Sequence, residues 1–408
     1  MSTRTPIAVP HGAVLLTGAT GFLGMELLAR YLERTDRHVV ALIRAADDRE
    51  ADGRLRATLA ALGGDRDGHA GRVTAVAGDL TAAGLGLGRR WAGLARRVGE
   101  IIHGAASVAF DLPLEGSRAI NVEGTRRMLG FARACSALER FTYVSTAYVA
   151  GDRGGTVYED DEKAGPFRNP YEQSKHEAER LVVAERERLP LTVARPSIVV
   201  GDRATGWTSS FNVLYAPLRA FAAGAYPVLP GRRRAPIDVV SVDYVADAIQ
   251  ALTEAPEATG QTYHLVAGRH ASSVAEIVGL GSARFGHREP RMVPPGLYRT
   301  VVAPLVAKRA SRTTRRLLER SEVYFPYFAM RQRFDDARAR ALLEPRGIAP
   351  APLREYFDRL VDFAQAARWG RRPIGRADAA ELAGSPAPEV RRPAPVTPAG
   401  RPARTPAR

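Results

Sequence analysis

The chain has 408 residues, of which 45% are hydrophobic, and a formal net charge of +15 at pH 7. This composition is ordinary for a globular protein of one large or two modest domains. The one cysteine, Cys135, excludes an intrachain disulfide framework, and no uninterrupted apolar stretch reaches the length of a membrane span. The positive charge comes partly from an arginine-rich tail, and no nucleic-acid-binding motif is recognisable. We therefore expect no nucleic-acid partner.

The polar residues 1–11 lack the apolar core of a secretory signal. We expect them to form a flexible leader. A single cysteine also fits a reducing compartment, so we expect a cytoplasmic protein.

Strand-like and helix-like stretches alternate through the first two hundred residues. Apolar runs predict strands over residues 13–17, 38–44, 72–80, 100–106, 141–151 and 191–201. Helical periodicity is clearest over residues 22–34, 121–135 and 171–188. Alternation of this kind predicts an α/β fold with a Rossmann-type, doubly wound parallel sheet.

The alternation loosens after the sixth predicted strand, where Gly, Pro and aromatic residues are frequent, as in a pocket wall. We therefore expect a nucleotide-binding domain with pocket insertions over residues 12–270 and a small, mostly helical substrate region over residues 271–370. From there on the chain consists mainly of Pro, Ala and Arg, so we expect residues 371–408 to be disordered.

The stretch LLTGATGFLG, residues 15–24, joins the first predicted strand to the first predicted helix. Its glycines, Gly18, Gly21 and Gly24, permit a tight turn and let a pyrophosphate approach the first amide groups of the helix. A glycine pattern alone is weak evidence, and an ordinary strand–helix turn is the alternative. Because strand, turn and helix are in register here, we favour a dinucleotide-binding loop.

The ends of the second and third predicted strands indicate which dinucleotide binds. Arg44 stands where an acidic residue would bind the ribose hydroxyl of NAD, and an arginine there accommodates the 2′-phosphate of NADP. Asp47 and Asp48 come three and four residues later, past the expected ribose. This arrangement favours NADPH as the cofactor, with a solvated surface arginine as the alternative. Asp79 ends the third strand, near the expected adenine.

The fourth predicted strand closes with HGAA, residues 103–106. Small residues at this point let a cofactor pass close to the backbone. We expect His103 to be structural or adjacent to the cofactor. No second His or Cys cluster completes a metal site, so we expect no metal.

Tyr171 and Lys175 lie four residues apart at the start of a predicted helix, which puts both side chains on one face. A free tyrosine titrates at about pH 10, and a neighbouring ammonium is expected to lower that pKa. The tyrosine could then exchange a proton with a carbonyl oxygen. Ser145 and Thr146 offer hydroxyls at the carboxyl edge of the sheet, where open α/β folds bind ligands. A surface helix pair and ordinary strand residues are the alternatives.

These stretches resemble the extended short-chain dehydrogenase/reductase family. The resemblance covers about residues 12–270 and rests on TGATGFLG, on the strand that ends in Ser145 and Thr146, on NPYEQSK and on RPSIVVG. Within the family, YVSTAYVAG and NPYEQSKHEAERLV look most like the fatty acyl-CoA reductase and thioester reductase branch. A later stretch, residues 322–342, is similar to the small C-terminal domain of fatty acyl-CoA reductases, where an acyl-chain pocket is completed.

The resemblance implies a catalytic set of Thr146, Tyr171 and Lys175. The cofactor-binding residues expected from it and from the motifs are Gly18, Thr20, Gly21, Phe22, Leu23, Gly24, Arg44, Asp79, Leu80, Ala105, Tyr171, Lys175 and Pro196. Aromatic residues that could line an apolar tunnel are Tyr324, Phe325, Tyr327, Phe328 and Phe334, with local core packing as the alternative for each. Ser145 is expected beside the substrate. The substrate's phosphates are expected to dock on Arg232, Arg233 and Arg234, with a solvated basic loop as the alternative.

We therefore expect an NADPH-dependent oxidoreductase of lipid metabolism that reduces an acyl thioester, with Tyr171 as the proton donor. The substrate would be a fatty acyl-CoA or an acyl chain on a carrier protein, and the product the aldehyde or, after a second hydride, the alcohol. Two alternatives share the fold: a hydroxysteroid-type dehydrogenase and a nucleotide-sugar epimerase or dehydratase. A non-catalytic NADP-sensing scaffold is the alternative of another class. Contact of the basic residues 297–320 with a membrane surface and a homodimer also remain open.

Overall fold

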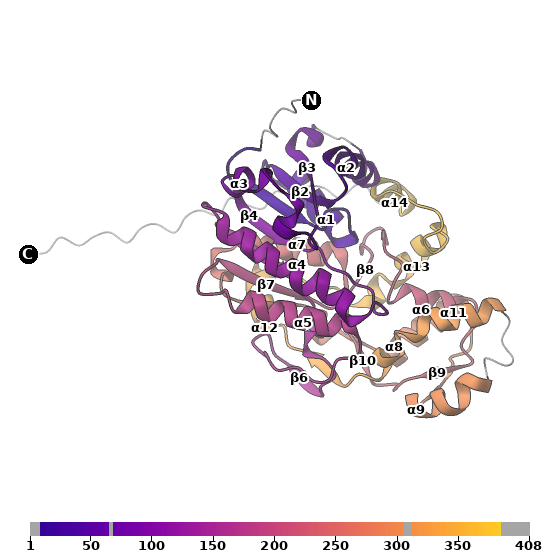
Figure 1. The fold of residues 1–408 in the computed structure, drawn as a ribbon. Helices are drawn as coiled ribbons and strands as arrows, with labels where there is room; N and C mark the ends of the chain where they lie inside the picture. Colours follow the sequence, from indigo (N-terminus) through magenta and orange to yellow (C-terminus); the bar gives the residue numbers. More distant parts are fainter. Residues whose placement is uncertain (1–8, 65–67, 306–311, 385–408) are drawn as a thin grey trace, which may run out of the picture.

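The computed structural model describes residues 9–64, 68–305 and 312–384. Its centre is a seven-stranded sheet in which all neighbouring strands are parallel (Figure 1). From edge to edge the strands are β12 (Thr262–Leu265), β7 (Leu191–Pro196), β5 (Arg140–Val144), β4 (Val98–His103), β1 (Ala13–Thr17), β2 (Val39–Arg44) and β3 (Val73–Gly78). The strand order reverses between β1 and β4, and ligands of such sheets bind at the carboxyl ends of the strands beside this point. The predicted doubly wound α/β fold is confirmed.

Helices cover both faces of the sheet. One face is buried by α1 (Phe22–Arg34), α2 (Asp48–Leu62), α7 (Val242–Glu254) and α12 (Ala337–Leu343). The other face is buried by α3 (Arg90–Ala95), α4 (Leu114–Ala134) and α5 (Pro170–Val183). A strand covered on both sides has no solvent-facing residues, which is why the sequence shows apolar runs here rather than alternation.

A second hydrophobic core lies at one end of the molecule (Figure 1). Its helical parts are α6 (Tyr215–Ala222), α8 (Val274–Phe285), η7 (Phe325–Ala329) and α13 (Phe357–Ala366). Around it lie α9 (Pro295–Leu297), η6 (Tyr298–Val302) and α11 (Arg312–Glu322). Four short strand pairs connect the segments: β6 (Gly155–Val157) with β15 (Gln332–Phe334), β8 (Ile198–Val200) with β11 (Val239–Ser241), β9 (Val228–Pro230) with β14 (Arg291–Val293), and β10 (Pro236–Ile237) with β13 (Ser272–Ser273). Both the middle of the chain and its C-terminal part therefore build this core.

The prediction of a strand over residues 141–151 is wrong for the second half of this range. Strand β5 ends at Val144, and Thr146 caps a short 3₁₀ helix, η3 (Ala147–Ala150), by accepting a hydrogen bond from the backbone of Tyr148. Gly151 then adopts a positive φ of 63°, which turns the chain away from the sheet. The apolar residues of this stretch are buried in the second core and not in a strand.

The predicted strand over residues 191–201 is two strands in two sheets. The backbone of Ser197 still bonds to Leu265 of β12, whereas Ile198 bonds to Asp238. The chain therefore leaves the main sheet at this point and pairs with β11. Strand β12, which forms the edge of the main sheet, was not among the predicted strands.

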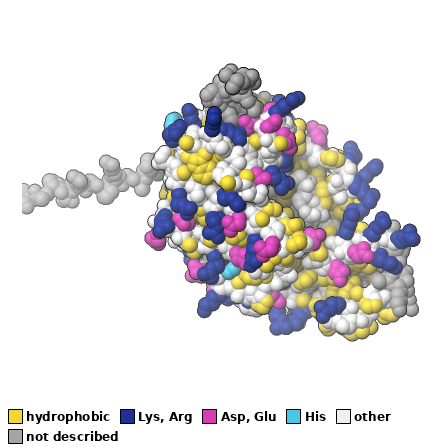
Figure 2. All heavy atoms as spheres, viewed as in Figure 1, with side chains coloured by type: hydrophobic (Ala, Val, Ile, Leu, Met, Phe, Trp, Pro, Cys, Tyr) yellow, Lys and Arg dark blue, Asp and Glu magenta, His cyan; other side chains and the backbone are white. Residues whose placement is uncertain are grey.

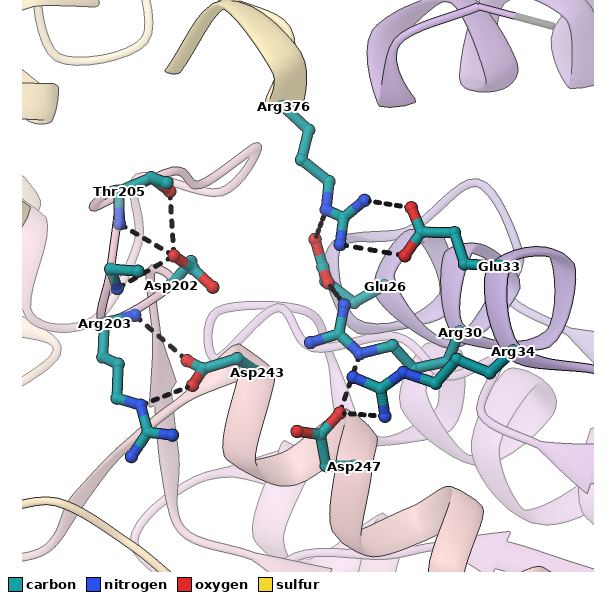
Figure 3. Close-up of polar contacts among 11 residues, drawn as sticks. Glu26, Arg30, Glu33, Arg34, Asp202, Arg203, Thr205, Asp243, Asp247 and Arg376 are labelled. Carbon is teal, nitrogen blue, oxygen red and sulfur yellow. Dashed lines mark hydrogen bonds and ion pairs between the residues drawn. The ribbon is translucent and has the colours of Figure 1, made fainter. Parts of the chain in front are cut away.

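The prediction of disorder from residue 371 is wrong for residues 371–384. Helix α14 (Arg376–Leu382) lies within this stretch, and its Ala379 is completely buried. Figure 3 shows Arg376 reaching Glu26 and Glu33 of α1, with Arg376 Nε 2.9 Å from Glu26 Oε1. This ion pair and the buried alanine face hold a helix that composition alone does not predict. Residues 385–408 of the predicted tail, and residues 1–8 of the predicted leader, lie outside the described residues.

The basic side chains are dispersed over the visible surface. Figure 2 shows Lys and Arg spread across the face in view, with acidic side chains between them. Across residues 9–64, 68–305 and 312–384, no helix is both long enough and apolar enough to cross a membrane.

Candidate active site

The glycine loop between β1 and α1 is fixed by steric contact. Gly18 has a φ of +81°, and a Cβ there would lie 2.9 Å from the backbone nitrogen of Ala105. At Gly24 a Cβ would lie 1.9 Å from the carbonyl oxygen of Gly18. Both positions therefore require glycine. Gly21 caps α1 without a side-chain hydrogen bond, so the first amides of the helix are left for an anionic ligand.

The carboxyl ends of β1 and β4 are joined by a buried polar contact. The Thr17 hydroxyl accepts a hydrogen bond from the Ala105 amide at 3.1 Å and lies 2.8 Å from His103 Nδ1. Burial, helped by the charge of Lys175, lowers the pKa of His103 to about 3, so the imidazole is neutral. His103 therefore holds the turn beside the glycine loop.

The second strand ends in a free arginine and two occupied carboxylates. Asp47 caps α2 by accepting from the Glu50 amide at 2.8 Å, and Asp48 binds Arg90 and the Ala77 amide. The exposed Arg44 guanidinium has no polar partner among the described residues. The Arg44 guanidinium is therefore available to an anionic ligand, whereas the two carboxylates are already engaged.

The residues after β3, where the sequence predicts the adenine, form a hydrogen-bonded loop. Asp79 Oδ1 accepts hydrogen bonds from the amide and the hydroxyl of Thr81, both at 2.7 Å. Leu80 packs beside Gly124 of α4, where a Cβ would come within 3.0 Å of the leucine side chain. Asp79 therefore shapes this loop in addition to any contact with a base.

Thr146 and Tyr171 meet at the carboxyl edge of the sheet. The Thr146 hydroxyl donates to the Pro196 carbonyl at 3.3 Å and lies close enough to the Tyr171 hydroxyl to act on its pKa. Burial raises the pKa of Tyr171 to about 12, against the effect of Thr146, which lowers it. Tyr171 is therefore a protonated donor at neutral pH. The neighbouring Ser145 is buried, and its hydroxyl has no hydrogen-bond partner within the described chain.

Lys175 does not act on Tyr171 in the way that the sequence suggests. Its Nζ donates to the Tyr143 hydroxyl and to the Val144 carbonyl, both at 2.8 Å, and lies 4.3 Å from the centre of the Tyr143 ring. Burial lowers the pKa of Lys175 to about 7. The lysine turns toward β5, so the expected lowering of the Tyr171 pKa is absent and burial raises that pKa instead.

Two residues around Tyr171, Asn121 and Phe110, were not predicted from the sequence. The Asn121 amide of α4 donates to Ser174 at 2.9 Å and to the Ser107 carbonyl at 3.1 Å, which ties the loop after β4 to α5. The Phe110 ring of that loop stacks on Tyr171, with centroids 5.5 Å apart. Neither residue lies in a recognisable motif, and only the fold brings them to the site.

A buried polar cluster joins the start of α5 to the C-terminal region. The Tyr327 hydroxyl donates to Glu172 at 2.7 Å and accepts from Asn169 at 2.9 Å. Glu172 also pairs with Arg168 at 3.2 Å. The residue that follows the candidate catalytic tyrosine is therefore bound to a side chain more than 150 positions later.

An apolar cavity of about 60 Å³ lies between β8, α6, α8 and η7. Three of the five predicted tunnel residues line it: Tyr324, Tyr327 and Phe328. The other two are core residues. Phe325 packs against Tyr226, Tyr298 and Phe328, and Phe334 packs against Tyr148 and His264. For Phe325 and Phe334 the alternative of local packing is correct.

Two of the three predicted basic docking residues, Arg232 and Arg233, line a separate open groove, and Arg234 does not. Arg232, Arg233 and Arg234 are exposed after β9, and the groove of about 630 Å³ is lined by Arg232, Arg233, Glu289 and Arg291 among others. The Arg232 amide donates to the Phe328 carbonyl at 2.9 Å, so the back of this groove adjoins η7. Within the described ranges, no cluster of His, Cys, Asp and Glu could hold a metal ion.

Comparison with known proteins places this site in a family. Residues 16–249 match the model of the Male sterility protein family, an NAD-binding family. The isonitrile lipopeptide synthase of Streptomyces coeruleorubidus is 40% identical over 53% of this chain and 15% of its own length. The L-2-aminoadipate reductase large subunit of Penicillium chrysogenum is 32% identical over 68% of this chain and 21% of its own. The chain thus spans only a small part of these relatives.

Among solved structures, the terminal R domain from the myxalamid PKS-NRPS biosynthetic pathway is similar over 90% of this chain and 94% of its own. The two share 28% sequence identity and superpose with a TM-score of 0.78. The glycine loop, Thr146, Tyr171 and Lys175 all lie within the residues that the family model matches. The chain belongs to the Male sterility protein family.

Proposed function

We propose that this chain is an NADPH-dependent reductase that releases an acyl group from the thioester of a carrier protein as an aldehyde. The observation that carries the proposal is that the Thr146 and Tyr171 hydroxyls lie at the carboxyl edge of the same parallel sheet that carries the glycine loop after β1. The similarity to the myxalamid R domain and to parts of large synthetases supports a carrier-bound substrate. A nucleotide-sugar epimerase is less well supported, because Arg44 stands where NAD would require an acid.

The glycine loop and the end of β2 fit NADPH. Gly18 and Gly24 leave the space that a Cβ would fill, and the first amides of α1 would bind the pyrophosphate. Arg44 would bind the 2′-phosphate. Lys175 would hold the nicotinamide ribose. When bound, the cofactor supplies the hydride that adds to the thioester carbonyl carbon.

Tyr171 and Thr146 act on the carbonyl oxygen. Because burial raises the pKa of Tyr171 to about 12, the phenol keeps its proton at neutral pH and can donate it to the oxygen as negative charge develops. The product of this step is a hemithioacetal. Its hydroxyl proton returns to Tyr171 as the C–S bond breaks, which releases the aldehyde, and the leaving thiolate takes a proton from water.

The groove lined by Arg232, Arg233 and Arg291 would bind the phosphate of a phosphopantetheine arm. These guanidinium groups are exposed, so they are accessible to a second protein and can form charge-assisted hydrogen bonds with a phosphate. The groove adjoins η7, whose aromatic residues line the apolar cavity. The arm and its acyl group would therefore enter from the same end of the molecule.

The proposal is tested by following NADPH oxidation with octanoyl-pantetheine thioester. Wild type should reduce it, and Tyr171→Phe should lower kcat by about 10²–10⁴-fold, the usual contribution of a positioned proton donor. The dissociation constant for NADPH should stay unchanged. Tyr158→Phe, a change at a tyrosine that is 53% exposed, is the matched control. Turnover of alcohols with NADP⁺ in place of any thioester would instead identify a dehydrogenase.

A further inference from the structure

Phe110 is a half-buried ring on a largely exposed segment. Its neighbours Ala109 and Asp111 are exposed, and Val108 is 60% exposed, whereas Phe110 is half-buried in the second core. The backbone of Ser107 is tied to Asn121. From residue 108 to residue 112, the described structure contains no backbone hydrogen bond. This short segment therefore turns the Phe110 ring inward. It is attached at Ser107 and at the half-buried Leu112, which lies against Gly116 of α4, and has no backbone hydrogen bond of its own within the described chain.

The Phe110 ring lies between Tyr171 and Tyr327. It is stacked on both, with centroid distances of 5.5 and 5.7 Å and interplanar angles of 24° and 26°. It also meets Tyr324 edge to face at 5.6 Å. Tyr324 and Tyr327 line the apolar cavity, and Phe110 does not. Phe110 therefore separates the catalytic tyrosine from the cavity.

Of the three stacked rings, Phe110 alone has no polar group. The Tyr327 hydroxyl is held by Glu172 and Asn169, and the Tyr171 hydroxyl lies close enough to Thr146 for that residue to lower its pKa. Phe110 sits on a segment without backbone hydrogen bonds in the described structure. Its position depends on the two stacking contacts, which another apolar group could replace.

We propose that Phe110 selects the substrate by acyl length, a step beyond the proposed reductase function on which it rests. A thioester carbonyl at the Tyr171 hydroxyl directs its acyl chain toward the cavity through the place that the Phe110 ring occupies. A short acyl group ends before the ring. A longer aliphatic chain must displace the ring and then takes over its contacts with Tyr327 and Tyr324.

The test compares acetyl- and octanoyl-pantetheine thioesters in wild type, Phe110→Ala and Phe110→Trp. Removing the ring should raise the octanoyl-to-acetyl ratio of kcat/KM by about tenfold, because displacement of one aromatic contact no longer opposes the longer chain. Phe110→Trp should lower the ratio. Val108→Ala, on the exposed part of the same segment, is the matched control and should leave the ratio unchanged. An unchanged or lowered ratio in Phe110→Ala would overturn the proposal.

A binding measurement separates this inference from the chemistry. The amide analogues of the two thioesters cannot be cleaved, and their dissociation constants are measured by calorimetry without turnover. Phe110→Ala should bind the octanoyl amide about tenfold more tightly and the acetyl amide as wild type does. If wild type reduces neither thioester, the reductase function fails, and the amide affinities still decide whether Phe110 selects by length. Equal octanoyl affinities in wild type and Phe110→Ala would refute it.

Discussion

The proposed cofactor side and the proposed substrate side of the site are built in different ways. On the cofactor side, Gly18, Gly21 and Gly24 set the geometry within one short loop, by leaving space next to the backbone. On the substrate side, the contacts are between side chains of distant segments, such as Asn169 and Tyr327. A side chain added at one of these glycines collides with backbone atoms and disrupts the loop. A change to one ring or hydroxyl on the substrate side removes only one of several contacts. Changes should therefore be severe on the first side and graded on the second.

Gly24→Ala should give the largest effect. Its methyl group would lie 1.9 Å from the Gly18 carbonyl oxygen, and that oxygen belongs to the backbone. We expect a loss of about 3 kcal/mol in the free energy of unfolding together with loss of NADPH binding. Chemical denaturation and a fluorescence titration with NADPH measure these two quantities.

The control for Gly24→Ala is Gly53→Ala in helix α2. A Cβ at Gly53 has no atom within 4 Å, so the helix should gain about 0.5–1 kcal/mol. A Gly24→Ala protein that binds NADPH as tightly as wild type would show that the glycine loop is not the cofactor site.

Arg44→Ala tests whether the cofactor side also contains contacts that give graded effects, because it removes a side chain there without disturbing the glycine loop. Loss of a charge-assisted contact to the 2′-phosphate should weaken NADPH binding by about 10–100-fold and leave NADH binding unchanged. The ratio of the two dissociation constants is the measured quantity. Arg49→Ala, at an exposed arginine of α2, should leave the ratio as it is. If Arg44→Ala weakened NADPH and NADH binding equally, Arg44 would not be the residue that binds the 2′-phosphate.

Tyr327→Phe should give the smallest effect. It keeps the ring stacked on Phe110 and removes the hydroxyl that donates to Glu172. We expect a loss of about 1 kcal/mol in unfolding free energy, because Arg168 still pairs with the carboxylate. Denaturation curves of this protein and of Tyr158→Phe, whose ring is exposed, measure the difference.

The loss in Tyr327→Phe should depend on pH. Burial raises the pKa of Glu172, against donors that include the Tyr327 hydroxyl, so removing that donor raises the pKa further. When folding raises the pKa of a carboxyl, the folded protein loses stability as the pH rises above the pKa of that carboxyl in the unfolded chain. At lower pH the carboxyl is protonated in both states, and the stability cost disappears. The loss should therefore shrink at acidic pH. An equal loss at every pH would show that Glu172 is not the group affected.

The sequence predicted the parts of the molecule that local chemistry determines. The glycine loop, the alternation of strands and helices, and the hydroxyl pair of Thr146 and Tyr171 all follow from short stretches. Strand β12 was missed because its four residues are too few to show a pattern. The partner of Lys175 was missed because Tyr143 lies on strand β5, and only the packing of helix α5 on the sheet brings the lysine to it.

The substrate side shows the same limit. Tyr327 was named from its aromatic neighbourhood, but its bond to Glu172 depends on β15 pairing with β6 across the chain. Phe110 lies in a segment without regular structure, and nothing in the residues around it indicates a ring beside Tyr171. Such contacts depend on tertiary packing, which a single sequence read locally does not contain.

The ion pairs of helix α14 bear on where this unit can be cut and joined to other proteins. Arg376 faces Glu26 and Glu33 on α1, and α1 is the helix that begins at the glycine loop (Figure 3). A fragment that stopped after α13 would keep every residue of the apolar cavity, yet it would leave Glu26 buried with Arg30 as its remaining cation. A fragment meant to be joined to another protein should therefore extend beyond Leu382, so that α14 stays paired with α1. The last residue of the apolar cavity is not a sufficient end point.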